Sequence, residues 1–210
     1  MRFLSPLRLM AVFFLMTIPL AGAGWAAPVA PDAAKAWVKA LVDDATVAFS
    51  AKQMTAEQQT GEVLRLIEAY SSLETLSRAI LGHHWDRAVP EDQESFKSLL
   101  GAYVVNTRVP KGENRKPGRS LDVGEAEAAG ERAVVHSLLK TPDEPPTPID
   151  WLVAAKEDGR PLVTDILSGG VSLVRTTRAD FTAVINANGG SFKALLDAMR
   201  VKAEVAAAAK

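Results

Sequence analysis

The sequence contains no cysteine among its 210 residues. This absence excludes disulfides, thiolate metal sites, cysteine nucleophiles and a lipid anchor on an N-terminal cysteine. It does not exclude an oxidising compartment, because a chain of this length can bury enough apolar surface to fold without disulfides. The sequence also has no excess of charge of one sign, because it contains 24 basic and 25 acidic residues. We therefore expect no nucleic-acid partner, since such proteins usually carry a basic surface.

The motifs of common enzyme classes are also missing. The chain has neither H-E-x-x-H nor G-x-S-x-G, and it has no G-x-x-x-x-G-K-[ST] phosphate loop, so we do not expect it to hydrolyse ATP itself. Of its three histidines, His83 and His84 are adjacent and are expected to point apart, and His136 has no acidic cluster nearby in the sequence. The sequence therefore predicts no metal and no cofactor.

Long hydrophobic runs are absent except at the N-terminus. Arg2 and Arg8 precede the apolar run 9–20, and small residues with Ala-x-Ala character follow it, which is typical of a secretory signal peptide. The run is shorter than the roughly 20 apolar residues that cross a membrane as a helix. We expect residues 1–27 to be cleaved and the rest to be exported and soluble, with one domain over 28–200 and a flexible alanine-rich tail over 201–210.

Segments with the apolar spacing of helices lie on both sides of a region whose residues alternate as in strands. Apolar residues at helical spacing predict helices over 32–50, after a capping box at 55–58, before Gly82, from Pro90 onward, and twice near the C-terminus. Alternating residues and turn signals between residues 120 and 167 predict four strands with short links, which favours antiparallel neighbours. Gly169 and Gly170 are expected to end the sheet. The order of elements predicts a single α+β domain, with a four-stranded antiparallel sheet packed against several helices.

Two acidic residues, Asp150 and Asp165, fall on neighbouring predicted strands. They could form a buried acid pair for general-base chemistry with a histidine, or they could separately satisfy backbone donors, which is the favoured interpretation. The basic segment 110–119 is compatible with contact to anionic lipid headgroups or a partner, and equally with a solvated loop. The remaining apolar stripes indicate either a filled core or a ligand cavity, and composition does not distinguish the two.

Three segments carry the pattern of a known family. They read ILGHHWDRAVPEDQESF at 80–96, VTDILSGGVSL at 163–173 and TRADFTAVINANGGSFKALLDAMR at 177–200. In this order and at these separations, they resemble the MlaC, or toluene-tolerance, family of periplasmic phospholipid-binding proteins. The resemblance extends from about residue 32 to residue 200. The chain departs from the family at 106–120, where an aromatic helical continuation is usual. The related hopanoid-associated HpnM branch shares the architecture.

The resemblance implies a variant of the NTF2-like arrangement, with an apolar cavity between sheet and helices. It implies a periplasmic carrier rather than an enzyme, with phospholipid as cargo. The implied partners are an outer-membrane lipoprotein–porin complex and an inner-membrane ABC transporter with an MCE-domain ring. The alternatives are a hopanoid-associated lipid-binding protein and a non-catalytic periplasmic interaction module with a filled core.

A carrier of this kind must shield acyl chains from water. Roughly 30 methylenes at about 0.8 kcal/mol each are costly to expose, and such a cargo would need a cavity of roughly 1,000 Å³. Trp85 and Tyr103 suit the rim of the cavity, because an amphipathic ring fits a boundary between acyl chains and water. The residues expected to line it are Leu76, Ile80, Trp85, Phe96, Leu99, Leu100, Tyr103, Val104, Trp151, Val153, Val163, Ile166, Val171, Leu173 and Phe181.

Overall fold

The computed structural model describes residues 28–50, 54–108 and 118–208. These residues form seven helices and five strands, with helices first, then the sheet, then two further helices. The predicted α+β class is therefore confirmed. The predicted signal peptide lies outside the described residues, as does most of the basic segment 110–119.

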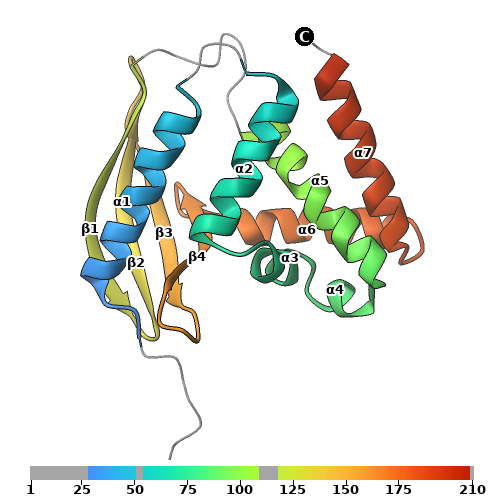
Figure 1. The fold of residues 1–210 in the computed structure, drawn as a ribbon, viewed down its shortest axis with the longest axis horizontal. Helices are drawn as coiled ribbons and strands as arrows, with labels where there is room; N and C mark the ends of the chain where they lie inside the picture. The colour runs from blue at the N-terminus through green and yellow to red at the C-terminus, as the bar shows by residue number, and fades with distance from the viewer. Residues whose placement is uncertain (1–27, 51–53, 109–117, 209–210) are drawn as a thin grey trace, which may run out of the picture.

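Helix α1, Pro31–Ala48, lies along one face of the sheet (Figure 1). Proline suits its first position because the first N–H groups of a helix have no partner within it. Ala34 and Val38 are fully buried and pack with the sheet residues. The Nζ of Lys35 reaches the carboxylate of Glu125 at 3.0 Å, which joins the exposed side of α1 to the first strand.

Helix α2, Ala56–Tyr70, begins with the predicted capping box. The backbone N–H of Gln58 donates to Thr55 Oγ1 at 3.2 Å, and the N–H of Thr55 donates to Gln58 Oε1 at 2.8 Å. Two N–H groups that the helix cannot pair are thereby satisfied. The position of the box fixes where α2 starts, and therefore which of its residues face inward.

Gly82 separates α3, Leu73–Leu81, from α4, His83–Arg87. Its φ of +54° is one that residues with a side chain rarely adopt. The sequence correctly predicts the end of α3 there but misses α4, because five residues are too few to display a helical period. Helix α5, Pro90–Arg108, starts at the predicted proline.

The sheet is antiparallel throughout, and its strands follow chain order from β1 to β5. The strands are β1 Ser120–Ala129, β2 Arg132–Lys140, β3 Thr147–Ala155, β4 Pro161–Ser168 and β5 Val171–Ser172. The weak alternation of the first strand has a structural cause, since its register with β2 shifts between Val123 and Ala126.

The prediction of four strands is wrong by one. Gly169 and Gly170, with φ of +55° and +80°, form a turn instead of ending the sheet. Two-residue β5 then pairs with the end of β4, through Leu167 with Ser172 and Ser168 with Val171. A strand of two residues has no alternation from which it could be predicted.

Helices α6, Leu173–Ala187, and α7, Phe192–Ala208, close the described chain. Helix α7 extends into the segment 201–210 that the sequence separates as a tail. Helices α2 to α7 gather beside the layer made by the sheet and α1 (Figure 1). Among the described residues, none of the helices is both long and apolar enough to cross a bilayer.

The buried apolar residues form two clusters rather than one. The helical cluster joins α3, α4, α5, α6 and α7, and its centre includes Trp85, Phe96 and Ile185 at 0% exposure. The sheet cluster joins α1 to strands β2, β3 and β4, with Val38, Val135 and Val153 at 0%. The separation of the two clusters leaves space between the sheet layer and the helices.

Candidate functional site: an apolar cavity

A cavity of about 620 Å³ lies between the two clusters. This volume is within the usual range of small-molecule sites, roughly 300 to 1,000 Å³, and below the roughly 1,000 Å³ expected from the sequence for a diacyl cargo. The lining residues come from both layers and are mostly aliphatic. They are Leu41, Val42, Ala45, Thr46, Val63, Leu66, Ile67, Tyr70, Ser71, Leu76, Ile80, Leu100, Tyr103, Val104, Leu121, Leu139, Trp151, Val163, Asp165, Ile166, Leu173, Val174 and Thr177.

Helical spacing explains how α1 and α2 contribute to the lining. On α2, the stripe Val63, Leu66, Ile67 and Tyr70 follows an i, i+3, i+4, i+7 pattern and turns toward the cavity. On α1, four residues beyond Val38 line the cavity, whereas Val38 itself packs in the sheet cluster; the four are Leu41, Val42, Ala45 and Thr46. One amphipathic face thus serves as core at one end and as cavity wall at the other.

Nine of the fifteen residues expected to line the cavity are brought together there. They are Leu76, Ile80, Leu100, Tyr103, Val104, Trp151, Val163, Ile166 and Leu173. They come from three helices and two strands, so the fold assembles them from segments far apart in the sequence. Their contact with a lipid stays a prediction.

The other six residues lie outside the cavity lining. Trp85, Phe96, Leu99 and Phe181 belong to or pack against the helical cluster, and Val153 is buried in the sheet cluster. Val171 is 58% exposed on the short strand β5. Trp85 does not sit at a rim, since it is 0% exposed and donates its indole N–H to Glu74.

The sequence-based reasoning misses the contributions of α1, α2, β1 and β2. Their apolar stripes are visible in the sequence, for example at Leu41, Val42 and Ala45. Periodicity identifies the inward face of a helix. Only the separation of the two clusters reveals that this face borders a space, and the sequence carries no direct signal for that separation.

Four polar side chains of the lining are already engaged by the protein. Thr46 Oγ1 donates to the carbonyl of Val42 at 2.7 Å, and Ser71 Oγ donates to the carbonyl of Val163 at 2.6 Å. The hydroxyl of Tyr70 donates to Asp44 at 2.7 Å. Burial raises the pKa of Tyr70, and the hydrogen bond to Asp44 adds to the shift.

Asp165 is the fourth engaged side chain. Its Oδ1 accepts from the N–H groups of Ile166 at 2.8 Å and Val174 at 3.1 Å, and its Oδ2 accepts from Ser172 Oγ at 2.5 Å. Ser172 in turn caps α6, accepting from the N–H of Arg175 at 3.0 Å. The favoured interpretation of Asp165, a carboxylate that satisfies backbone donors, is confirmed.

Asp150 lies apart from the cavity lining. It alternates with Ile149 and Trp151, which are buried on the inner face of the sheet, so it faces the other side. There His136 Nδ1 lies 2.8 Å from Asp150 Oδ1, and this hydrogen bond raises the pKa of His136. The acid-pair hypothesis requires Asp150, Asp165 and a histidine to converge on one cavity. In the structure these side chains lie in different places.

The adjacent histidines do not point apart, contrary to the expectation. The rings of His83 and His84, both on the short helix α4, lie with their centroids 4.0 Å apart. Burial lowers the pKa of His84, and the charges of His83 and Arg87 add to the shift. Within the described residues, no group of three or more His, Cys, Asp and Glu side chains could hold a metal ion.

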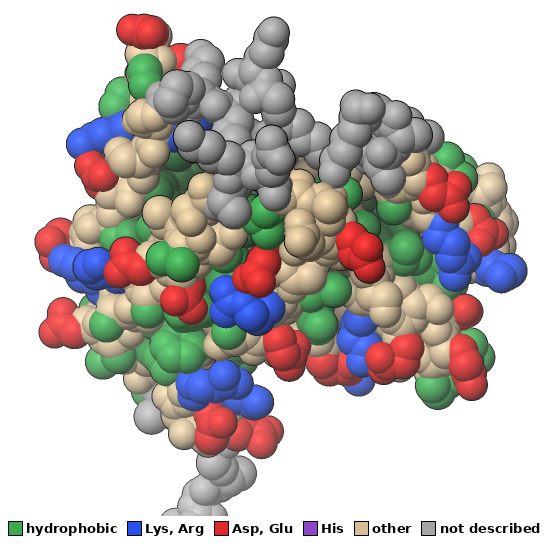
Figure 2. Space-filling view, turned by 45° about the horizontal axis from the view of Figure 1, so that its top comes forward, with side chains coloured by type: hydrophobic (Ala, Val, Ile, Leu, Met, Phe, Trp, Pro, Cys, Tyr) green, Lys and Arg blue, Asp and Glu red, His purple; other side chains and the backbone are tan. Residues whose placement is uncertain are grey.

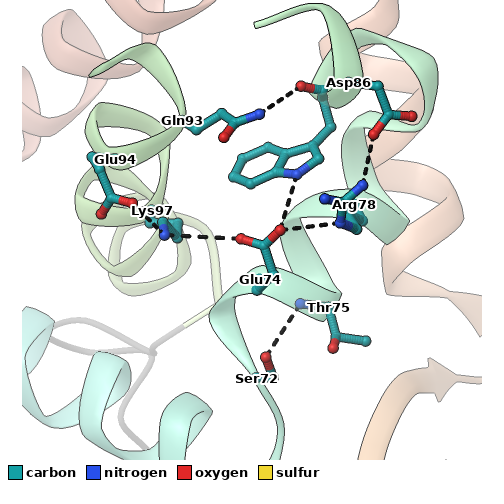
Figure 3. Close-up of polar contacts among 9 residues, drawn as sticks. Ser72, Glu74, Thr75, Arg78, Asp86, Gln93, Glu94 and Lys97 are labelled. Carbon is teal, nitrogen blue, oxygen red and sulfur yellow. Dashed lines mark hydrogen bonds and ion pairs between the residues drawn. The ribbon is translucent and has the colours of Figure 1, made fainter. Parts of the chain in front are cut away.

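Polar contacts join helices α3, α4 and α5 (Figure 3). Glu74 on α3 accepts from Trp85 Nε1 of α4 at 3.2 Å and from Arg78 Nε at 3.0 Å. Gln93 on α5 donates to the carbonyl of Trp85 at 2.9 Å, and Arg78 Nη1 donates to Asp86 Oδ1 at 2.6 Å. These contacts fasten α3, α4 and α5 into one unit that carries part of the cavity wall.

The surface around this fold has no strong excess of one charge on the face shown in Figure 2, where acidic and basic side chains are interspersed. Ion pairs such as Lys39 with Asp43 and Lys140 with Asp122 reflect this mixing. Of the basic segment 110–119, only Gly118 and Arg119 are described, and Arg119 is exposed. The expected contact of this segment with headgroups therefore stays a prediction.

Comparison with known proteins agrees with this geometry. The family model described as MlaC protein matches residues 39–201. Among solved structures, the chain is similar to the phospholipid-binding protein from Ralstonia solanacearum, determined in complex with a phospholipid. The identity is 22% and the TM-score 0.67, over 83% of this chain and 98% of the other. No curated protein sequence matches the chain.

Proposed function

The chain belongs to the MlaC family, and we propose that it is a periplasmic carrier that holds a phospholipid by its acyl chains. In this proposal residues 1–27 direct export and are removed. The carrier receives and delivers lipid at two membrane complexes. These are an outer-membrane lipoprotein–porin complex and an inner-membrane ABC transporter with an MCE-domain ring, which supplies the energy.

The observation that carries the proposal is the apolar cavity of about 620 Å³ between the sheet and the helices. Each methylene removed from water contributes about 0.8 kcal/mol, so acyl chains are the cargo that such walls favour most. A non-catalytic module with a filled core is disfavoured, because that alternative requires that no such cavity exists. The phospholipid in the Ralstonia solanacearum protein, which has the same fold, supports the same cargo class.

The volume restricts what the cavity can hold. It is smaller than the roughly 1,000 Å³ expected for two long chains, so full enclosure requires either shorter chains or separation of the walls. The headgroup lies outside in this proposal, in keeping with the mostly aliphatic lining.

Native mass spectrometry of the protein from a periplasmic extract, followed by lipid extraction, tests the proposal. We expect a mass excess of one phospholipid per chain, and its mass reports the acyl chain length. A hopanoid would instead indicate the HpnM branch. A lipid-free mass, with nothing acquired from liposomes, would contradict the carrier.

A cavity-filling variant makes the test specific. Ala45→Trp places an indole in the cavity from α1, and we expect it to abolish the lipid mass. Ala40→Trp is the matched control, because Ala40 is on the same helix but exposed. Equal lipid content in both variants would show that the lipid binds elsewhere.

A further inference from the structure

Two polar side chains of the cavity differ from the others. Thr46, Tyr70, Ser71 and Asp165 all have hydrogen-bond partners inside the protein. No hydrogen bond within the described residues involves the hydroxyl of Tyr103 or of Thr177, although both side chains line the same cavity. The contrast separates hydroxyls that hold the fold from hydroxyls left available in the cavity.

Both available hydroxyls belong to buried residues. Tyr103 is 8% exposed and Thr177 is 6% exposed. Buried hydroxyls in proteins nearly always have a partner, because leaving one unpaired away from water costs free energy. A tyrosine in particular usually pairs its hydroxyl when the ring is buried. The fully buried polar atoms without a partner in the described part of the chain are Ser77 Oγ and His84 Nε2, so the hydroxyls of Tyr103 and Thr177 are open to the cavity. A partner for either hydroxyl therefore has to come from what fills the cavity.

The two residues belong to one corner of the cavity. The ring of Tyr103 on α5 packs edge-on against Phe181 of α6, with centroids 4.9 Å apart. Phe181 lies one helical turn after Thr177, on the same face of α6. Both hydroxyl-bearing residues are thus held by the packing of α5 against α6, and their backbones are fixed within helices.

We propose that Tyr103 and Thr177 form a polar subsite that donates hydrogen bonds to an oxygen of the bound lipid. The chemistry required is an acceptor oxygen attached to an acyl chain, and the ester carbonyl of a glycerophospholipid supplies it. A hydroxyl group on the chain would supply the same chemistry. This inference rests on the proposed lipid-carrier function and adds to it a preference among lipids of equal apolar size.

The subsite predicts discrimination between ester and ether lipids. A diester phospholipid has carbonyl oxygens where the matching diether has none, while headgroup and chain length are the same. The wild-type protein should bind the diester more tightly. Each hydrogen bond made to a partner that would otherwise remain unpaired is expected to change affinity by about 2- to 10-fold.

The experiment compares the two lipids in competition on the full chain, read by native mass spectrometry. The variants are Tyr103→Phe and Thr177→Val, singly and together, because each removes a hydroxyl and keeps the shape of the side chain. We expect each to lose about 2- to 10-fold in affinity for the diester and none for the diether. The thermal midpoint of the lipid-free variants should not fall, since no internal hydrogen bond is lost.

Matched controls distinguish a subsite from a general effect on the cavity. Tyr70→Phe and Thr46→Val remove hydroxyls that pair within the protein, so they should change the affinities for both lipids alike. A third lipid, a diether with a hydroxyl on one chain, separates the two sources of the oxygen. Binding of this lipid at diester strength would assign the subsite to chain hydroxyls as well as ester carbonyls.

Other outcomes overturn the inference without touching the proposed function. If the wild-type protein and both variants bind diester and diether equally, the hydroxyls pair with water and the subsite does not exist. If the wild-type protein binds neither lipid, the carrier function itself fails.

Discussion

Asp165 connects strand β4 to the start of helix α6 through two hydrogen bonds, from Ser172 Oγ and from the N–H of Val174, and it also accepts from the N–H of Ile166 on its own strand. A carboxylate at this position also lies favourably near the positive end of the helix dipole. Asp165→Asn keeps one acceptor oxygen and loses the charge. We expect the free energy of unfolding to fall by about 1 to 2 kcal/mol, measured by urea denaturation.

Asp180→Asn serves as the control, because Asp180 is exposed further along the same helix. It should leave the unfolding midpoint nearly unchanged. Unchanged stability in Asp165→Asn, together with loss of a chemical activity, would revive the acid-pair hypothesis.

His136 provides a pH-dependent contribution at the residue scale. Its hydrogen bond to Asp150 raises its pKa, burial opposes this, and the charges of Asp150 and Glu127 add to the increase. Because the folded-state pKa lies above the ordinary 6.5, the stabilisation is complete below that value and is lost as pH rises through the folded-state pKa.

His136→Gln should therefore destabilise the protein only on the acidic side. The effect should not exceed about 1 kcal/mol, because the imidazole is about half exposed and water screens the pair. Urea denaturation of both proteins across this pH range measures the difference. A difference that grew as the pH rose would contradict the assignment.

At the scale of elements, Gly101 sets how closely α2 and α5 approach. A Cβ at this position would lie 2.6 Å from Leu64 Cγ and 3.1 Å from Thr60 Cγ2, closer than packed atoms tolerate. Gly101→Ala should therefore separate two helices that line the cavity. The crowding costs about 1 to 3 kcal/mol, against a gain of about 1 kcal/mol in helix propensity, so we expect a net loss in thermal denaturation.

The control for this prediction is Gly61→Ala on α2. Gly61 is exposed within its helix and a Cβ there would meet nothing within 4 Å. It should stabilise the protein by about 0.5 to 1 kcal/mol. Equal gains in both variants would show that the α2–α5 approach is not tight.

The sequence predicts elements best where they are long. Helices α1, α2 and α5 carry several turns of periodic apolar residues and caps or prolines at their starts, and they are found where expected. Helix α4 and strand β5 have five and two residues, which are too few to show a period.

The residues of the cavity are less predictable from the sequence than the elements are. On α5, Phe96 and Leu100 share one stripe and both belong to the helical cluster, yet only Leu100 also borders the cavity.

At the scale of the whole molecule, the cavity links stability to cargo. A ligand that binds only the folded state adds RT ln(1 + [L]/Kd), about 2.7 kcal/mol at a hundredfold excess over Kd. We expect a short-chain phospholipid, used below its micelle concentration, to raise the melting temperature by several degrees. The Ala45→Trp variant should lose this shift and the Ala40→Trp variant should keep it.

The separation of the two apolar clusters has a further consequence for the energetics of transport. The walls between them are apolar surfaces that the polypeptide does not cover with its own side chains. Covering them with acyl chains should lower the heat capacity of the system, which is the reliable sign of apolar burial. The enthalpy of loading should then become more negative as temperature rises. A carrier with such walls is expected to bind its lipid with an affinity that changes with temperature.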